Sequence, residues 1–337
     1  MAKTDDKKKL PPLIIFKRKR RRKKNKRKFL LAPKINNLES LIEIARSNIP
    51  YSNIDIRRLW NALPNLERLN AIIGMSSLKQ TVFLQIVYYL KLLHKKGNEE
   101  YLHTILIGSP GCGKTMVAEI IGNIYKDLGI LSDKGVFKIA RREDFIGQYV
   151  GHSEHKTMEL LNSCKGGVLF IDEAYALGMS DTFSKSIINI LNSFLSENKN
   201  NFCCILAGYE DDLNRCFFEK NSGLRSRFQW THRIDSYDEA DLSRIFIKKI
   251  SDIEWHCELS APEIQHVIEE NKDLFTSYGR DIENLVTKCK ISHGKRIFHL
   301  DDKHSFIITL EDMNNAIALI REHNITTTAT QHLSMYS

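Results

Sequence analysis

The feature that most constrains this chain is the glycine-rich octapeptide GSPGCGKT at residues 108–115. It follows the apolar run TILI and precedes the helical stretch MVAEIIGNIY, which is the strand–loop–helix setting that the pattern GxxxxGK, then Ser or Thr, requires. Gly108, Gly111 and Gly113 allow the backbone to curl so that successive N–H groups point at phosphate oxygens, and the positive end of the following helix adds to the attraction. The octapeptide therefore predicts a phosphate-binding loop.

The side chains of this loop predict which ligand it takes. Lys114 is expected to reach the β and γ phosphates of a nucleotide, and the Thr115 hydroxyl is expected to ligate Mg²⁺. ATP and Mg²⁺ are therefore the expected cofactors. We assign nucleotide binding to the whole loop and to the residue after it, namely Gly108, Ser109, Pro110, Gly111, Cys112, Gly113, Lys114, Thr115 and Met116.

A second motif, GVLFIDEA at residues 167–174, supplies an apolar strand that ends in two carboxylates. At the tip of a buried strand beside the phosphate loop, Asp172 can hold Mg²⁺ through water, and Glu173 can orient and deprotonate the attacking water. A glutamate directly after the metal aspartate favours hydrolysis over signalling by slow turnover. The two motifs together predict an ATP hydrolase.

The apolar pattern predicts how the chain is organised. Five short apolar runs, TILIG, VFKIA, GVLFID, FCCILAG and THRID, alternate with amphipathic stretches, which is typical of parallel βαβ units. From about Tyr237 the chain is helical, and SAPE at 260–263 and TLED at 309–312 have the form of capping boxes. We therefore expect a basic disordered tail (1–34), a helical lead-in (35–70), an α/β ATPase domain (71–236), a helical lid (237–325) and a flexible end (326–337).

The N-terminal tail has an unusual composition. Residues 1–34 contain 16 of the 50 Lys and Arg residues of the chain and only two acidic residues. Such a block repels itself and cannot bury apolar surface, so we expect it to be disordered until something anionic neutralises it. It is compatible with a nuclear import signal read by an import receptor, with a grip on nucleic acid or acidic lipid, or with a solvated tail that has no partner.

Two further features bear on location. The apolar LPPLIIF in the tail is too short for a membrane span or for a secretory signal. The seven cysteines are odd in number and show no CxxC spacing, which favours reduced thiols. We expect a cytoplasmic or nuclear protein that is not secreted and does not cross a membrane.

Five motifs occur in a fixed order along the chain: GSPGCGKT, YVGHS, GGVLFIDEAYAL, ILAGYEDDLNR and NSGLRSRF. In this order they resemble the AAA+ ATPases, in the branch that contains the red-type Rubisco activase CbbX and stage V sporulation protein K; similar ATPases also occur in large DNA viruses. The resemblance runs from about Leu66 to Ile320. It implies a P-loop NTPase domain with a doubly wound, parallel five-stranded sheet, a small all-α lid, and a homo-oligomeric ring, usually a hexamer, with ATP between neighbouring subunits.

The resemblance also implies roles for residues beyond the two ATP motifs. Ile73 and Gly74 fall where the family lines the adenine pocket, although alone they would read as a turn before a helix. Arg227 matches the arginine finger, which stabilises charge on the γ-phosphate of a neighbouring subunit, and Arg225 is a possible second contact. Surface salt bridges are the alternative for both arginines.

Two sensor positions follow from the same resemblance. Arg280, in YGRDIENL, matches the sensor 2 arginine that reaches from the lid to the γ-phosphate, and its alternative is an ion pair with Asp281 or Glu283. The sensor 1 residue should be polar and lie at the end of the fourth strand, where Tyr209 and Glu210 are both candidates.

The segment between the two ATP motifs carries the predicted pore loop. In AAA+ rings an aromatic, a hydrophobic residue and a glycine face the central channel, and Tyr149, Val150 and Gly151 match this triplet. An aromatic side chain can grip an extended polypeptide by burying area and by stacking. The alternative is a tyrosine packed at the start of a helix. The stretch FSKSII lacks the family's Gly-Gln-Glu-Ala pattern, so a second pore loop is not assigned.

The leading hypothesis is therefore an Mg²⁺-dependent ATPase ring that remodels a protein substrate. The alternative is a nucleic-acid-directed ATPase, such as a loader or packaging factor, that uses the basic tail.

Overall fold

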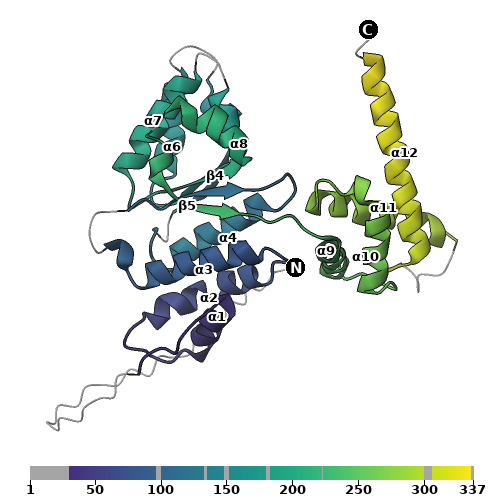
Figure 1. The fold of residues 1–337 in the computed structure, drawn as a ribbon, viewed down its shortest axis with the longest axis horizontal. Helices are drawn as coiled ribbons and strands as arrows, with labels where there is room; N and C mark the ends of the chain where they lie inside the picture. Colours follow the sequence, from purple (N-terminus) through teal and green to yellow (C-terminus); the bar gives the residue numbers. More distant parts are fainter. Residues whose placement is uncertain are drawn as a thin grey trace, which may run out of the picture.

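The computed structural model describes residues 30–95, 100–132, 135–147, 152–179, 183–221, 223–299 and 306–334. Its main body is a parallel sheet with helices on both faces, and a smaller helical unit follows it (Figure 1). The sheet has the strand order β2-β3-β4-β1-β5, and all four pairings are parallel. The strands are β1 (His103–Ile107), β2 (Phe137–Ala140), β3 (Val168–Ile171), β4 (Cys203–Gly208) and β5 (Phe228–Arg233).

The fifth strand is shifted from its prediction. It begins at Phe228 rather than Thr231, and it ends at Arg233 rather than Asp235. Phe228 is buried and lies opposite His103 of β1, so the ladder starts earlier than the apolar run suggested. The other four strands follow the predicted runs closely, which confirms the doubly wound parallel sheet.

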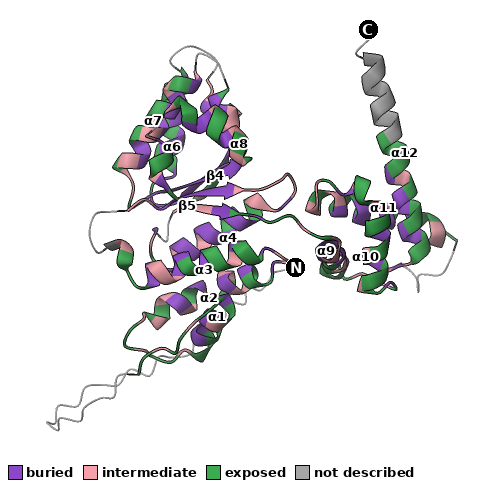
Figure 2. Cartoon of the chain, in the orientation of Figure 1, coloured by how far each residue is buried: buried purple, intermediate pink, exposed green. Residues whose placement is uncertain are grey.

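Alternating side chains of the buried strands belong to two separate cores. Figure 2 shows β4 coloured as buried. On β4, Cys203, Ile205 and Ala207 belong to one core, and Cys204 and Leu206 belong to the other. This is the pattern expected for a parallel sheet covered on both faces. The first core is covered by α1 (Leu38–Ser47), α2 (Ile56–Asn70), α3 (Ser76–Leu90) and α4 (Lys114–Asp127), and the second by α5 (Arg142–Phe145), α6 (His152–Ser163) and α7 (Ser184–Glu197).

The predicted helical lead-in is part of the first core. Leu41 of α1 and Leu66 of α2 are buried in the same cluster as Ile121 of α4. The side chain of Asn65 also donates a hydrogen bond of 2.7 Å to Asp127 at the end of α4. The two N-terminal helices therefore pack directly on the layer that carries the phosphate loop, and the boundary at residue 70 stays a prediction.

The lid has its own core, built by α9 (Glu239–Asp252), α10 (Ala261–Glu270), α11 (Gly279–Ile297) and α12 (Leu310–Ser334). It is not entirely α-helical, because β6 (His256–Cys257) and β7 (Ile307–Ile308) form a short parallel pair. The expected flexible end at 326 does not coincide with a helix end, since α12 continues to Ser334. Both predicted capping boxes are confirmed, at Ser260 with Glu263 and at Thr309 with Asp312.

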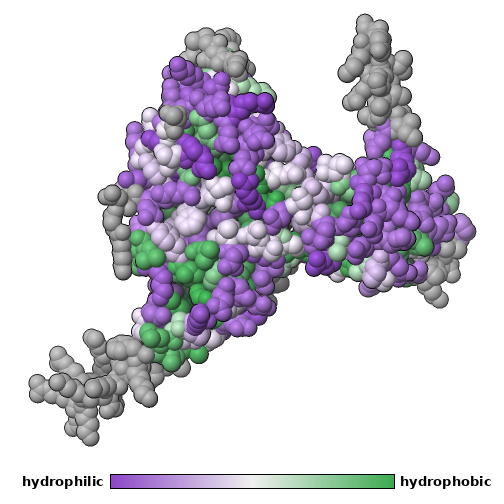
Figure 3. Space-filling view, in the orientation of Figure 1, coloured by the Kyte–Doolittle hydropathy of each residue, from purple (hydrophilic) through white to green (hydrophobic). Residues whose placement is uncertain are grey.

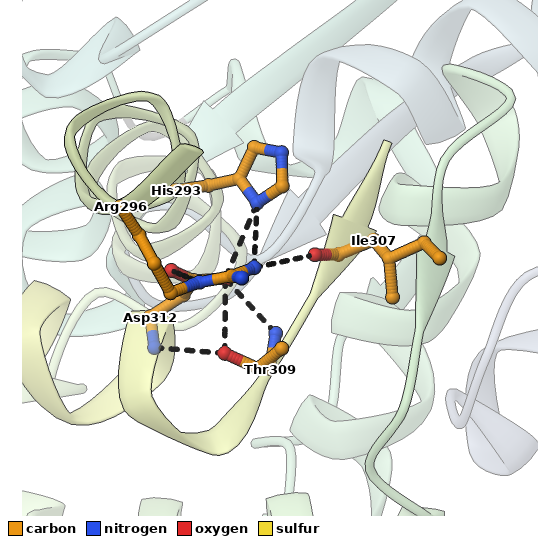
Figure 4. Close-up of polar contacts among 5 residues, drawn as sticks. All are labelled: His293, Arg296, Ile307, Thr309 and Asp312. Atoms are coloured by element: carbon orange, nitrogen blue, oxygen red, sulfur yellow. Dashed lines mark hydrogen bonds and ion pairs between the residues drawn. The ribbon is translucent and has the colours of Figure 1, made fainter. Parts of the chain in front are cut away.

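A buried ion cluster joins α11 to the start of α12 (Figure 4). The carboxylate of Asp312 is fully buried and accepts hydrogen bonds from Arg296 at 2.9 Å, from the Thr309 N–H at 3.0 Å and from His293 at 3.3 Å. Arg296 also donates to the Ile307 carbonyl of β7. Burial would raise the pKa of Asp312, but the bonds from Arg296 and Thr309 outweigh it and hold the pKa below its usual value.

Surface character differs between the two parts. On the face shown in Figure 3 the lid is mostly hydrophilic, whereas apolar residues gather around α3, where Leu84, Leu92 and Leu93 are exposed. The cysteines are free, and five of the seven are buried. Within the described ranges, no helix combines the length and apolar character needed to cross a membrane.

Candidate nucleotide site

A cavity of about 790 Å³ lies between the carboxyl ends of the strands and the lid. Its walls come from the phosphate loop, the end of β3, the end of β4, the segment before α3 and the facing sides of α9 and α11. The predicted site residues that line it are Ile73, Pro110, Gly111, Cys112, Gly113, Lys114, Thr115, Met116, Asp172, Glu173 and Arg280.

The phosphate loop connects β1 to α4, as the sequence predicted. Gly111 and Gly113 have φ values of +69° and +91°, a region that side-chain-bearing residues rarely adopt. Lys114 begins α4, and its ammonium group donates hydrogen bonds to the carbonyls of Gly108 at 3.0 Å and Ser109 at 2.8 Å. Gly108 and Ser109 themselves do not line the cavity. The loop thus places one cation and a helix N-terminus at the same wall.

The two predicted carboxylates stand where β3 ends. The backbone of Asp172 extends the ladder by donating to the Ala140 carbonyl at 3.0 Å. Glu173 then adopts a left-handed conformation, with φ 51° and ψ 47°, and its N–H donates to Asp172 Oδ1 at 3.2 Å. A non-glycine residue held in this region is a local strain of the kind that gathers at functional sites. The turn directs both side chains into the cavity.

Of the two sensor 1 candidates, only Tyr209 lines the cavity. Its ring centre lies 5.8 Å from the Lys114 ammonium and 6.2 Å from the ring of Tyr175. Burial and the nearby Glu173 carboxylate raise the pKa of Tyr209. Glu210 points elsewhere and forms an ion pair with Arg233.

The lid touches the phosphate loop directly. A Cβ atom built at Gly111 would lie 2.0 Å from the Ser277 carbonyl oxygen and 3.2 Å from Arg280 Cβ. The Tyr237 hydroxyl donates to the Cys112 carbonyl at 3.3 Å. Arg280 is therefore placed beside the phosphate loop, at the first turn of α11.

Part of the cavity lining is apolar. Ile72 and Ile73 line it, together with Ile245 of α9. Gly74 does not line it and faces the lid instead, where its Cβ would lie 2.8 Å from a carboxylate oxygen of Asp241. A lining that combines apolar side chains with a phosphate loop suits the base and the phosphates of a nucleoside triphosphate.

Comparisons with known proteins agree with this geometry. The family described as "ATPase family associated with various cellular activities (AAA)" matches residues 104–250. A cfxQ-like protein of Acanthamoeba polyphaga mimivirus, R730, is 36% identical over 312 residues, which cover 89% of this chain and 76% of that protein. This chain is an AAA ATPase.

Two further relatives specify the branch. Stage V sporulation protein K of Bacillus subtilis is 31% identical over 244 residues, or 68% of the ATPase and 75% of that protein. Protein CfxQ of Xanthobacter flavus is 35% identical over 207 residues, or 58% and 63% of the two chains. The ATPase therefore belongs to the CfxQ-like branch, and its activity is ATP hydrolysis.

The fold is shared more widely. A structure of a Thermotoga maritima RuvB mutant aligns with a TM-score of 0.54 over 74% of the ATPase and 72% of that chain. The sequence identity is only 19%, so this likeness concerns the fold alone.

The two predicted finger arginines of the ATPase lie away from its own cavity. Arg227, half-buried, donates from Nε to the Ser196 hydroxyl at 2.7 Å and from Nη1 to the Gly223 carbonyl. Arg225 is exposed and donates to the Phe228 carbonyl at 2.9 Å. Neither arginine is in an ion pair with a described residue, so the alternative of surface salt bridges finds no support in the described chain.

Hydrogen bonds hold the two flanks of the predicted pore loop. The Gly147 N–H donates to the buried Ser153 hydroxyl at 2.9 Å, and Lys156 donates to the Ile146 carbonyl at 2.9 Å. These bonds join the two ends of the segment. The triplet itself lies outside the described residues: Tyr149, Val150 and Gly151.

Most of the lid wall of the ATPase was not predicted from the sequence. Besides Arg280, this wall contains Tyr237, Ile245, Lys248, Lys249, Asp252, Gly279 and Glu283. The four residues from α9 have the spacing i, i+3, i+4 and i+7, which places them on one helix face. That periodicity was visible in the sequence, but its mixture of one apolar and three charged residues does not distinguish a ligand-facing surface from a solvated one.

Proposed function

We propose that this AAA ATPase cleaves ATP at the seam between neighbouring copies in a ring, usually a hexamer in this family, and uses the cycle to remodel a protein substrate. The observation that carries the proposal is a division of the catalytic groups. Lys114, Asp172, Glu173 and Arg280 meet in one cavity, whereas Arg227 is held elsewhere on the same chain. A finger that cannot reach its own nucleotide would serve the next one.

Each group in the cavity has a proposed task. Lys114 binds the β and γ phosphates, and Glu173 takes the proton of the attacking water. Thr115 and Asp172 line the same cavity and offer oxygen donors, which suit a hard cation, so they would hold Mg²⁺. When bound, Mg²⁺ neutralises charge on the phosphate oxygens. Ile73 and its apolar neighbours would enclose the adenine.

The remodelling step rests on the predicted pore loop. Tyr149 would grip an extended polypeptide, with Val150 beside it and Gly151 giving freedom to the backbone. The bonds of Gly147 to Ser153 and of Lys156 to Ile146 support the proposal, because a loop that pulls needs fixed ends.

Mixing two inactive variants tests the shared site. Arg227→Ala lacks the finger, and Glu173→Gln lacks the base. Mixed rings contain some interfaces with both groups intact, so the mixture should recover measurable ATP turnover. A mixture that stays inactive, in rings whose assembly is verified by light scattering, would contradict the seam.

A trap experiment tests the substrate class. Glu173→Gln should bind ATP without releasing its cargo, and a pull-down should recover a dominant protein partner. The matched Tyr149→Ala, Glu173→Gln double variant should recover less of it. Recovery of DNA or RNA in place of protein, lost when residues 1–34 are deleted, would replace this proposal with a nucleic-acid-directed ATPase.

A further inference from the structure

Arg280 is flanked by two carboxylates on its own helix, and each of them is occupied by another partner. Asp281 accepts a hydrogen bond from the Ser277 N–H at 2.5 Å. Glu283 accepts one from the Lys249 ammonium of α9 at 2.6 Å. Among the described residues, the Arg280 guanidinium has no hydrogen bond or ion pair, and it lines the nucleotide cavity.

This arrangement is not what the helix alone would favour. Residues three apart on a helix are neighbours, and oppositely charged side chains at this spacing attract. Arg280 and Glu283 have this spacing on α11. An arginine paired with that glutamate would have to break the pair before it could contact a phosphate.

Lys249 is the described group with which Glu283 pairs, in place of Arg280. It belongs to the face of α9 that lines the cavity, and 32% of its side chain is exposed, against 65% for Glu283. The preceding lysine, Lys248, is engaged differently, because it donates to the Ala71 carbonyl at 3.3 Å. Lys249 is thus the α9 cation that reaches Glu283.

We propose that Lys249 is a positioning residue for nucleotide sensing. By binding Glu283, it keeps that carboxylate from Arg280, so the guanidinium stays available for the γ-phosphate. The inference rests on the proposed contact between Arg280 and the γ-phosphate, and it adds a second-helix residue that controls that contact.

The test compares the affinity for β,γ-imido-ATP with the affinity for ADP, each with Mg²⁺. Lys249→Met should weaken binding of the triphosphate by about 1.5- to 5-fold, the range of an ion pair at a protein surface, and leave ADP unchanged. Adding Glu283→Gln to this variant should restore the affinity, because the competing charge is gone. Lys249→Arg should behave like the wild type.

A double-mutant cycle with Arg280→Ala separates an effect of Lys249 on the position of Arg280 from a simple loss of positive charge. If Lys249 acts through Arg280, Lys249→Met should have no further effect in an Arg280→Ala background. A loss of triphosphate affinity of the same size in that background would show that Lys249 acts directly by its charge, and would overturn the proposal. A Lys249→Met, Glu283→Gln double variant as weak as Lys249→Met would also overturn it.

The controls distinguish the inference from the function on which it rests. Lys272→Met breaks the 2.7 Å pair with Glu239, another lid ion pair, and neither residue lines the cavity, so affinity should not change. If Arg280→Ala binds the triphosphate normally, both the proposed contact of Arg280 with the γ-phosphate and the inference about Lys249 are wrong. If Arg280→Ala weakens triphosphate binding but Lys249→Met does not, the inference about Lys249 is wrong and the proposed contact of Arg280 stands.

Discussion

The two walls of the nucleotide cavity are built on different principles. The sheet wall carries Lys114 at the start of α4 and Asp172 and Glu173 at the end of β3, where backbone pairing and a close-packed core fix their positions. The lid wall consists of side chains on half-exposed helices, and hydrogen bonds such as those of Lys248 and Lys249 orient them. The proposed hydrolytic groups therefore lie on the wall that strand pairing fixes, whereas Arg280, the proposed sensor 2 residue, lies on the wall whose side chains are oriented by hydrogen bonds.

This contrast makes the sheet wall the more sensitive one to substitution. Glu173→Gln keeps the size of the side chain but removes its ability to take a proton. We expect turnover to fall by about 10²- to 10⁴-fold, the usual contribution of general acid–base catalysis, with ATP affinity retained. Steady-state hydrolysis and equilibrium binding of ATP measure the two quantities. Equal losses of turnover and ATP affinity would mean that Glu173 also contributes to binding the nucleotide.

Lys114→Ala should follow, with a roughly 10²-fold or greater loss of turnover, since it removes a preorganised charge aimed at the phosphates. Unlike Glu173→Gln, it should also abolish measurable ATP binding. Lys91→Ala is a matched control, because Lys91 likewise donates to a backbone carbonyl, that of Asn53, but does not line the cavity. Normal ATP affinity in the Lys114→Ala variant would show that the phosphate loop does not bind the nucleotide.

Asp312→Asn tests whether the lid is a separately stabilised wall. It removes one partner of a buried ion cluster, which typically costs about 3–5 kcal/mol of unfolding free energy. Chemical denaturation followed by the fluorescence of Trp255, which packs on His293, should report the loss. Trp60 and Trp230, in the main body, should each be replaced by Phe for this measurement.

The Asp312 carboxylate also makes the stability of the lid depend on pH in the acid range. Because the pKa of Asp312 in the folded protein lies below its unfolded value of about 3.9, its contribution to stability is present above that value and is lost as the pH falls through the folded pKa. The Asn variant should lack this part of the acid transition. An unchanged acid transition in the variant would assign it to other groups.

Tyr237→Phe is the smallest expected effect. It deletes only the hydroxyl that donates to the Cys112 carbonyl, and it leaves the ring packed on Tyr278. The loss of one neutral hydrogen bond between the walls should cost about 1 kcal/mol and change the KM for ATP less than tenfold. A change in kcat with an unaltered KM would instead link this contact to the chemical step.

The sequence was sufficient for the sheet wall because its residues are constrained locally. A phosphate loop needs glycine, lysine and threonine at fixed spacing, and a carboxylate pair must follow a strand, so GSPGCGKT and LFIDEA could be located by pattern. The start of β5 at Phe228 was missed because it depends on pairing with β1. Lys249 and Glu283 were missed as cavity residues because their meeting depends on how α9 and α11 pack.

Gly111 has a mechanical consequence. A single methyl group at this position would collide with the Ser277 carbonyl, and the backbone conformation there already disfavours any side chain. Gly111→Ala would push the lid away from the phosphate loop. Nucleotide binding by the loop and nucleotide sensing by Arg280 would then no longer be coupled. The absence of one carbon atom is what allows the Ser277 carbonyl to lie against the phosphate loop of this ATPase.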